Sequence, residues 1–312
     1  MAVTISAKQV QVLREMTNAG MMDCKRALVE AEGDYDKAVN ILREKGLAAA
    51  AKKATRIAAE GVVFPAVYDD GKKAVMVEVN SETDFVAKNE VFKTFVSDVA
   101  GVIAKNEPAD IDALLACKFD DEFTVSEALK DKIFKIGENL KLRRFATFND
   151  GYNAAYDHMH GKIGVIANFA IEGIEPSEAL ERVCKDVCMQ IAFGLQLAAG
   201  RGLYASREEV PAEAVEKEKA FLVEQAMKEG KPEAIAQKMV NGRINKFFQE
   251  ICVVDQAFIK DDSISTGKYI ETAAKDLGGK IKLVKFVSYE KGEGLEKKQD
   301  DFAAEVAKMV QK

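Results

Sequence analysis

The sequence predicts an α+β protein that combines a helical N-terminal module with small antiparallel sheets and helices packed on them. Three observations indicate this class. Short helical patterns come first, two apolar runs then flank Asp70-Gly71 as in a hairpin, and later strand patterns precede an amphipathic helix at 176–193. With 312 residues, 48% of them hydrophobic and 31% charged, the chain has a globular composition and room for more than one domain.

The composition and the N-terminal sequence favour a cytoplasmic protein. The N-terminus lacks the unbroken apolar stretch of a signal peptide, and no window approaches the roughly 18 apolar residues of a membrane span. The five cysteines are an odd number without framework spacing, which indicates reduced thiols. A net charge of −6 argues against nucleic acid as the main partner, because phosphate binding needs a basic face. We therefore expect no membrane and no direct nucleic-acid partner.

The N-terminal segment has the pattern of three short helices. Ser6 can cap the first helix, which Gly20 stops, and the second runs over about 23–32. Asp34 can cap the third, which we expect to end at a lysine just before Gly46. The alanine-rich residues that follow are typical of a solvated linker that is at least partly helical.

The middle of the chain alternates strand and helix patterns. A hairpin is expected on both sides of Asp70-Gly71, followed by a helix with a buried face. Thr124 and Glu127 stand at capping-box spacing and open another helix that ends near Gly137. Strands over 140–148 and 162–171 then precede the helix at 176–193. Strand, turn, strand and helix thus occur twice, which indicates a weak internal duplication.

The C-terminal part begins with a helical hairpin. Pro211 can start a long helix, Gly230 breaks it and Pro232 starts its return. A last strand over 278–290 and a terminal helix over 301–310 follow. The predicted segments are an N-terminal three-helix module at 1–46, a linker at 47–60, a first core subdomain at 61–142, a second at 143–204 and 251–290, the helical hairpin at 205–250, and a C-terminal module at 291–312.

The sequence contains few signals of a catalytic or nucleotide-binding site. None of the five Gly-Lys pairs is followed by Ser or Thr, so the chain has no phosphate-binding Walker loop. His158 and His160 could form a zinc site with Cys184 and Cys188, which keeps a metal-dependent enzyme open as an alternative. Cysteines four apart on an apolar helix face are more often core residues. We expect no catalytic residue, no metal and no cofactor.

A short segment between a strand and a helix places an aromatic ring among polar groups. Thr83, Asp84, Phe85 and Val86 follow the second hairpin strand. Phe85 lies seven residues before Phe92, so the ring could extend the buried face of the next helix. Its polar neighbours favour an exposed ring, because such a junction can hold a binding residue rigidly yet in solvent. The residues alone leave both interpretations open.

Two further segments combine apolar side chains with a turn. Met21 and Met22 follow Gly20, and they either fill a gap between helices or offer an adaptable contact surface. Ile136 and Gly137 have the pattern of a helix C-cap with its hydrophobic contact.

These segments also carry a family resemblance. The stretches AGMMDCKRAL, NSETDFVAKNEVF, KIGENLKLRRF, YDHMHGKIGV and GKPEAIAQKMVNGR are similar to elongation factor Ts, in the same order and over nearly the whole chain. The resemblance implies a guanine nucleotide exchange factor for elongation factor Tu, the GTPase that carries aminoacyl-tRNA to the ribosome. It implies a binding protein and not an enzyme.

The resemblance also implies which residues contact the GTPase. Phe85 is expected to enter an apolar pocket beside the nucleotide site, with Asp84 next to it, and the N-terminal module is expected to hold a helix of the same domain. The implied contact residues are Thr83, Asp84, Phe85, Val86, Met21, Met22, Lys25, Ile136, Gly137, His158 and Val240. The helical hairpin matches a protrusion that dimerises in some members, so a homodimer stays open.

One alternative function does not involve nucleotide exchange. The three N-terminal helices resemble ubiquitin-associated modules, whose exposed loop binds small proteins without altering their ligands. A protein-binding scaffold is therefore the alternative to an exchange factor.

Overall fold

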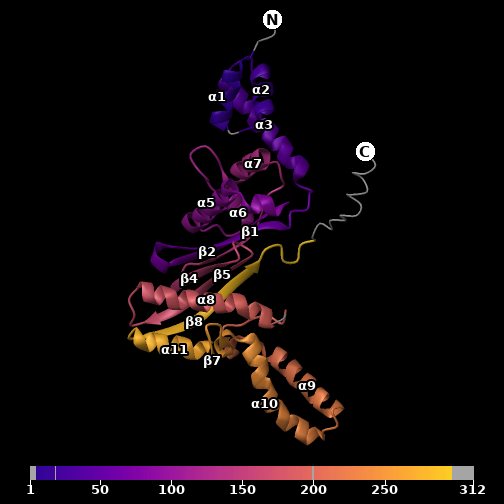
Figure 1. The fold of residues 1–312 in the computed structure, drawn as a ribbon, viewed down its shortest axis with the longest axis vertical. Coiled ribbons are helices and arrows are strands. Elements are labelled where there is room, and N and C mark those ends of the chain that lie inside the picture. The colour runs from indigo at the N-terminus through magenta and orange to yellow at the C-terminus, as the bar shows by residue number, and fades with distance from the viewer. Residues whose placement is uncertain (1–4, 18, 199, 297–312) are drawn as a thin grey trace. The chain divides into compact units, whose positions relative to one another are not determined.

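The computed structural model describes residues 5–17, 19–198 and 200–296. It mixes helices with small antiparallel sheets, which confirms the predicted α+β class (Figure 1). The chain divides into two compact units, one of Met1–Val62, Val77–Phe145 and Lys291–Lys312 and the other of Val63–Met76 and Ala146–Glu290. Each unit is described by itself below. The terminal helix expected at 301–310 lies outside the described residues.

The first unit begins with the three expected helices, α1 (Ala7–Thr17), α2 (Met21–Glu30) and α3 (Tyr35–Lys53). Their buried side chains, among them Leu13, Cys24 and Leu28, form one cluster. The Ser6 hydroxyl accepts a hydrogen bond from the Gln9 amide at 3.3 Å, and the Asp34 carboxylate accepts one from the Lys37 amide at 3.0 Å. Both residues cap their helices as the sequence predicts.

The third helix is predicted to end just before Gly46, but it continues to Lys53. Gly46 lies on the buried face of α3, where an added Cβ would be 3.5 Å from that of Phe134 on helix α7 (Val125–Ile136). The four alanines at 48–51 favour helix strongly, and Ala50 is buried. Packing against α7 and alanine propensity together outweigh the cost of one glycine, which is about 1 kcal/mol.

Three strands form a sheet in the order β1-β2-β3, and four helices follow β2 along the chain. The bounds are β1 (Glu60–Tyr68), β2 (Lys73–Ser81), α4 (Asp84–Lys88), α5 (Glu90–Asn106), α6 (Ile111–Ala116), α7 (Val125–Ile136) and β3 (Lys141–Phe148), with a 3₁₀ turn, η1 (Asp69–Gly71), between β1 and β2. The side chains expected on the buried face of α5, such as Phe92 and Phe95, are buried. The predicted capping box of Thr124 and Glu127 is present.

The second unit contains an antiparallel sheet in the order β4-β5-β8, with α8 and α11 packed on it. The bounds are β4 (Tyr152–His158), β5 (Ile163–Glu172), α8 (Glu178–Ala198), β6 (Ala257–Phe258), β7 (Asp261–Ser265), α11 (Thr266–Asp276) and β8 (Lys280–Glu290). The sequence reasoning missed β4, whose Asn, Ala and Asp residues have low strand propensity. The second strand-turn-strand-helix unit therefore starts at β4, because β3 belongs to the other sheet.

The predicted helical hairpin consists of α9 (Ala212–Lys228) and α10 (Glu233–Ile251). Pro211 and Pro232 stand at the two N-caps, as expected. Short 3₁₀ turns, η2 (Arg207–Glu209) and η3 (Val253–Asp255), flank the pair. Its cluster of buried side chains includes Val240 and Phe247. Across the part of the chain that the structure describes, no helix is both long enough and apolar enough to span a membrane.

Candidate functional site

The side chain of Phe85 is exposed. It retains 80% of its accessible surface, whereas Phe92 on the next helix retains none. The buried stripe does not extend back to Phe85, because α4 ends at Lys88 and the extended backbone of Asn89 separates it from α5. The interpretation of Phe85 as a core residue of the next helix is therefore wrong.

Local hydrogen bonds hold the turn that carries Phe85. Thr83 has an extended backbone, and its hydroxyl accepts from the Val86 amide at 3.4 Å. Lys88 pairs with Asp84 at 2.6 Å, one helical turn apart, and this hydrogen bond lowers the pKa of the Asp84 carboxyl. Ala87 is buried and so fixes the inner side of α4. The short helix therefore has one buried side and one side that presents Phe85.

A carboxylate from a distant segment completes the turn. The Oε2 atom of Glu138 accepts hydrogen bonds from the backbone amides of Glu82 and Thr83 at 3.1 and 3.0 Å. Its Oε1 atom accepts from the Thr83 hydroxyl at 2.6 Å. In return, Glu82 accepts from the amide of Asn139 at 2.6 Å. Sequence reasoning missed Glu138, because an isolated glutamate after a helix gives no signal of a partner 55 residues away.

Ile136 and Gly137 lie directly before this carboxylate. Ile136 is the last residue of α7, and Gly137 adopts the left-handed conformation with φ +89°, so the predicted C-cap is confirmed. The Gly137 amide donates to the Ile133 carbonyl at 3.0 Å. The structure thus brings two expected contact segments, 83–86 and 136–137, to one hydrogen-bonded cluster.

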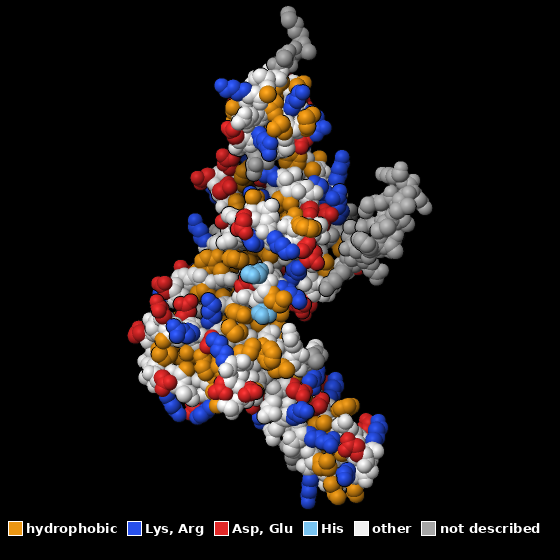
Figure 2. Space-filling view, in the orientation of Figure 1, with side chains coloured by type: hydrophobic (Ala, Val, Ile, Leu, Met, Phe, Trp, Pro, Cys, Tyr) orange, Lys and Arg blue, Asp and Glu red, His pale blue; other side chains and the backbone are white. Residues whose placement is uncertain are grey.

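Met21, Met22 and Lys25 form a separate exposed set on the N-terminal module. The methionines lie in the first turn of α2, not in the turn before it, and they retain 55% and 61% of their surface. Together with Lys25 they line a groove against α1, beside Val10 and Arg14. In Figure 2 hydrophobic and basic side chains lie side by side over these helices. Their exposure favours a contact surface over a gap filled between helices.

The last two expected contact residues lie in the second unit. His158 ends β4, half-buried, and its Nδ1 is 3.2 Å from the Tyr156 hydroxyl. Val240 retains only 5% of its surface inside the α9–α10 cluster. This burial gives Val240 a packing role in the hairpin and argues against a direct contact with another protein.

The zinc interpretation finds no support in this geometry. Cys184 and Cys188 lie in the sheet–helix core of the second unit, and burial raises the pKa of Cys184 to about 12. Both thiols pack among apolar side chains of this core, as small hydrophobic residues do. Within residues 5–17, 19–198 and 200–296, no three His, Cys, Asp or Glu side chains are grouped to hold a metal.

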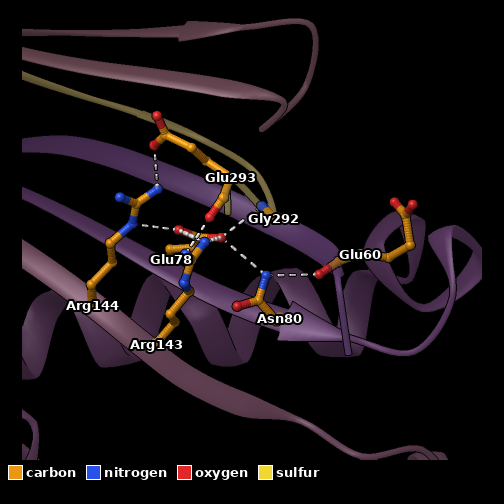
Figure 3. Close-up of polar contacts among 7 residues, drawn as sticks. All are labelled: Glu60, Glu78, Asn80, Arg143, Arg144, Gly292 and Glu293. Atoms are coloured by element: carbon orange, nitrogen blue, oxygen red, sulfur yellow. Dashed lines mark hydrogen bonds and ion pairs between the residues drawn. The ribbon is translucent and has the colours of Figure 1, made fainter. Parts of the chain in front are cut away.

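Strand β2 also carries a buried charge, three residues before its last residue, Ser81. Glu78 is fully buried and accepts from Arg143 at 3.0 Å, from Arg144 at 2.6 Å and from the Gly292 amide at 2.8 Å (Figure 3). Burial by itself would raise the pKa of Glu78, but the hydrogen bonds from Gly292, Asn80 and the two arginines outweigh it and lower the pKa. This cluster joins β2, β3 and the segment after β8.

A second polar residue in this cluster is only partly satisfied. The Nδ2 atom of Asn80 donates to Glu78 and to the Glu60 carbonyl, both at 3.0 Å. Its Oδ1 atom is buried and has no hydrogen-bond partner. The amide orientation is thus set by its two acceptors, at the cost of one unsatisfied oxygen.

Comparison with known proteins identifies the family. The family model described as Elongation factor TS matches residues 82–293. The chain is 51% identical to elongation factor Ts of Clostridium perfringens strain SM101, over 98% of this chain and 99% of that protein. It is 47% identical to elongation factor Ts of Clostridium botulinum strain Eklund 17B, over 99% and 100%, and 46% identical to that of Clostridium novyi strain NT, over 98% and 99%.

Identity at this level over nearly the full length of both chains is sufficient for assignment. The predicted resemblance is confirmed, and the chain belongs to the elongation factor Ts family.

Proposed function

We propose that this protein is a cytoplasmic guanine nucleotide exchange factor for elongation factor Tu in translation. The observation that carries the proposal is the exposed Phe85 ring on a turn that hydrogen bonds hold from both sides. An exposed aromatic on a rigid turn is a ready anchor for a pocket on another protein. Membership of the elongation factor Ts family implies the partner, the GTPase elongation factor Tu.

Exchange needs binding energy and no catalytic acid or base. A GTPase holds GDP through backbone amides around the phosphates and through a Mg²⁺ ion. A factor that binds the metal-free form of the GTPase better than the nucleotide-bound form lowers the affinity of the GTPase for nucleotide. Bound nucleotide lowers the affinity for the factor by the same amount. The chain performs no bond-making reaction under this proposal.

The size of the effect requires several anchors. Burying one phenylalanine contributes about 1.5–3 kcal/mol, which is roughly one to two decades in an equilibrium constant. Met21, Met22 and Ile136 add apolar surface, and Lys25 and Asp84 add charge at the two exposed segments. His158, in the second unit, is a further residue that contacts elongation factor Tu under this proposal. We leave Val240 out of the contact set because it is buried.

The release of a fluorescent GDP analogue from elongation factor Tu tests the function. The wild-type protein is expected to accelerate release strongly, and Phe85→Ala is expected to lose most of that acceleration. Phe221→Ala is the matched control, since this ring on α9 is also exposed, at 60%. It is expected to keep the wild-type rate. Binding without any change in the GDP off-rate would instead establish the scaffold alternative, which the exposed methionines of the N-terminal module also suit.

A further inference from the structure

We propose that Glu138 is a positioning residue for nucleotide exchange, and that it acts by fixing the turn that presents Phe85. The proposal rests on the proposed function, because positioning Phe85 affects exchange only if that ring binds the GTPase. Glu138 itself need not touch the partner.

The local hydrogen bonds of the turn are supplemented by a contact from a distant segment. Helix α4 has five residues, and a single helical turn is unstable unless tertiary contacts hold it. Its N-terminal side-chain cap, in which the Val86 amide donates to the Thr83 hydroxyl, is long at 3.4 Å. Contacts outside the helix therefore help to fix the backbone before it.

Glu138 supplies that fixation with both carboxylate oxygens. It accepts from two successive backbone amides and from the Thr83 hydroxyl, and the last of these bonds is short at 2.6 Å. A charged acceptor makes hydrogen bonds about twice as strong as a neutral one. The same hydroxyl that caps α4 is therefore oriented by Glu138.

We call the hydrogen bonds between residues 82–83 and 138–139 the clamp. The clamp is reciprocal, because the Glu82 carboxylate accepts from the Asn139 amide. In each of the two segments, 82–83 and 138–139, a glutamate thus accepts hydrogen bonds from backbone amides of the other segment. Ile136 and Gly137 immediately precede this anchor, and the left-handed Gly137 turns the chain toward it. Both proposed contact segments therefore share one anchor.

Loss of the clamp should act through Phe85. Without it the turn samples more conformations, and the complex has to order them on binding. Glu138→Ala is expected to lower the acceleration of GDP release about tenfold, equivalent to about 1.4 kcal/mol. Glu138→Gln keeps a carbonyl that can accept from the two amides, so it should recover part of the loss. Glu175→Ala, at an exposed carboxylate before α8, is the matched control and should change nothing.

A double-mutant cycle distinguishes positioning from a separate contact. In a Phe85→Ala background, Glu138→Ala should change GDP release by less than twofold, because the ring that it positions is already gone. A tenfold loss in both backgrounds would overturn the proposal, as would a wild-type rate for Glu138→Ala alone.

Amide hydrogen exchange tests the clamp without the GTPase. In Glu138→Ala the amides of Glu82 and Thr83 should exchange faster, while the amides of α5 keep their protection. Unchanged protection at Glu82 and Thr83 would refute the clamp whatever the kinetics. If the wild-type protein does not accelerate GDP release, the proposed function fails and takes this role with it, although the faster amide exchange would still occur.

Discussion

The backbone amide of Gly292 donates a hydrogen bond to the carboxylate of Glu78 at 2.8 Å, across 214 residues of chain. Glu78 has no exposed surface, and its other partners are Asn80, Arg143 and Arg144. Gly292 has φ +68°, and an added Cβ would lie 2.3 Å from the Ala59 carbonyl oxygen. The glycine is needed both for its conformation and for its close approach. One buried carboxylate therefore fixes the chain after β8 against β2.

Glu78→Ala is expected to destabilise the protein by about 3 kcal/mol, near the low end for breaking a buried ion pair. The low end applies because the side chains of Arg143 and Arg144 keep 19% and 28% of their surface and can reach water. Urea unfolding measures the change. Glu90→Ala is the control, with a side chain that is 84% exposed, and should stay within about 0.5 kcal/mol of wild type. Equal stability of the two variants would contradict the role of Glu78.

The lowered pKa of Glu78 predicts a loss of stability in acid. In the folded state its pKa is below the ordinary value of 4.5, so the unfolded chain takes up the proton first as the pH falls. The stabilisation is complete above pH 4.5 and is lost as the pH falls through the folded pKa. Melting temperatures of wild type and Glu78→Gln, followed over this range, should converge toward low pH. A constant difference would show that the charge of Glu78 contributes nothing.

Phe85→Ala should leave the free energy of unfolding within about 0.5 kcal/mol of wild type, because the ring is exposed. Phe95→Ala, which removes a ring that is 1% exposed, should cost about 3–5 kcal/mol. Thermal unfolding of both variants checks the contrast. A strongly destabilised Phe85→Ala variant would mean that the ring packs inside the protein in solution.

Gly137→Ala should cost about 1–2 kcal/mol, because an alanine at φ +89° is strained. An added Cβ at this position meets no atom within 4 Å, so backbone strain is the only penalty. Gly137→Asn should cost less, since asparagine tolerates the left-handed region better. Chemical denaturation of the three proteins gives the order, and an alanine variant as stable as wild type would argue against the left-handed cap.

Met21→Ala combined with Met22→Ala should weaken binding to elongation factor Tu about tenfold with little effect on stability. Both side chains are more than half exposed, and only bound protein would bury them. Val29→Ala on the same helix, also about half exposed, is the control. Isothermal titration with nucleotide-free elongation factor Tu measures the change. Equal weakening by both variants would show that the methionines have no special part.

The sequence by itself determined the local elements whose signals lie within a few residues. Examples are the capping box at Thr124, the proline starts of α9 and α10, and the glycine stop after Ile136. Such signals are local because caps and turns satisfy backbone groups next to them. The motif around Phe85 likewise indicated the family, which the comparisons confirm.

Only the tertiary structure decided which of two local alternatives holds. The periodicity of α5 permitted a buried Phe85, and the break at Asn89 excluded it. Gly46 had the pattern of a helix end, and packing on Phe134 carried the helix past it. Strand β4 had no propensity signal, and pairing with β5 made it a strand. The partners of Glu78 and Glu138 likewise come from distant segments, because a buried carboxylate takes whichever donors the fold brings to it.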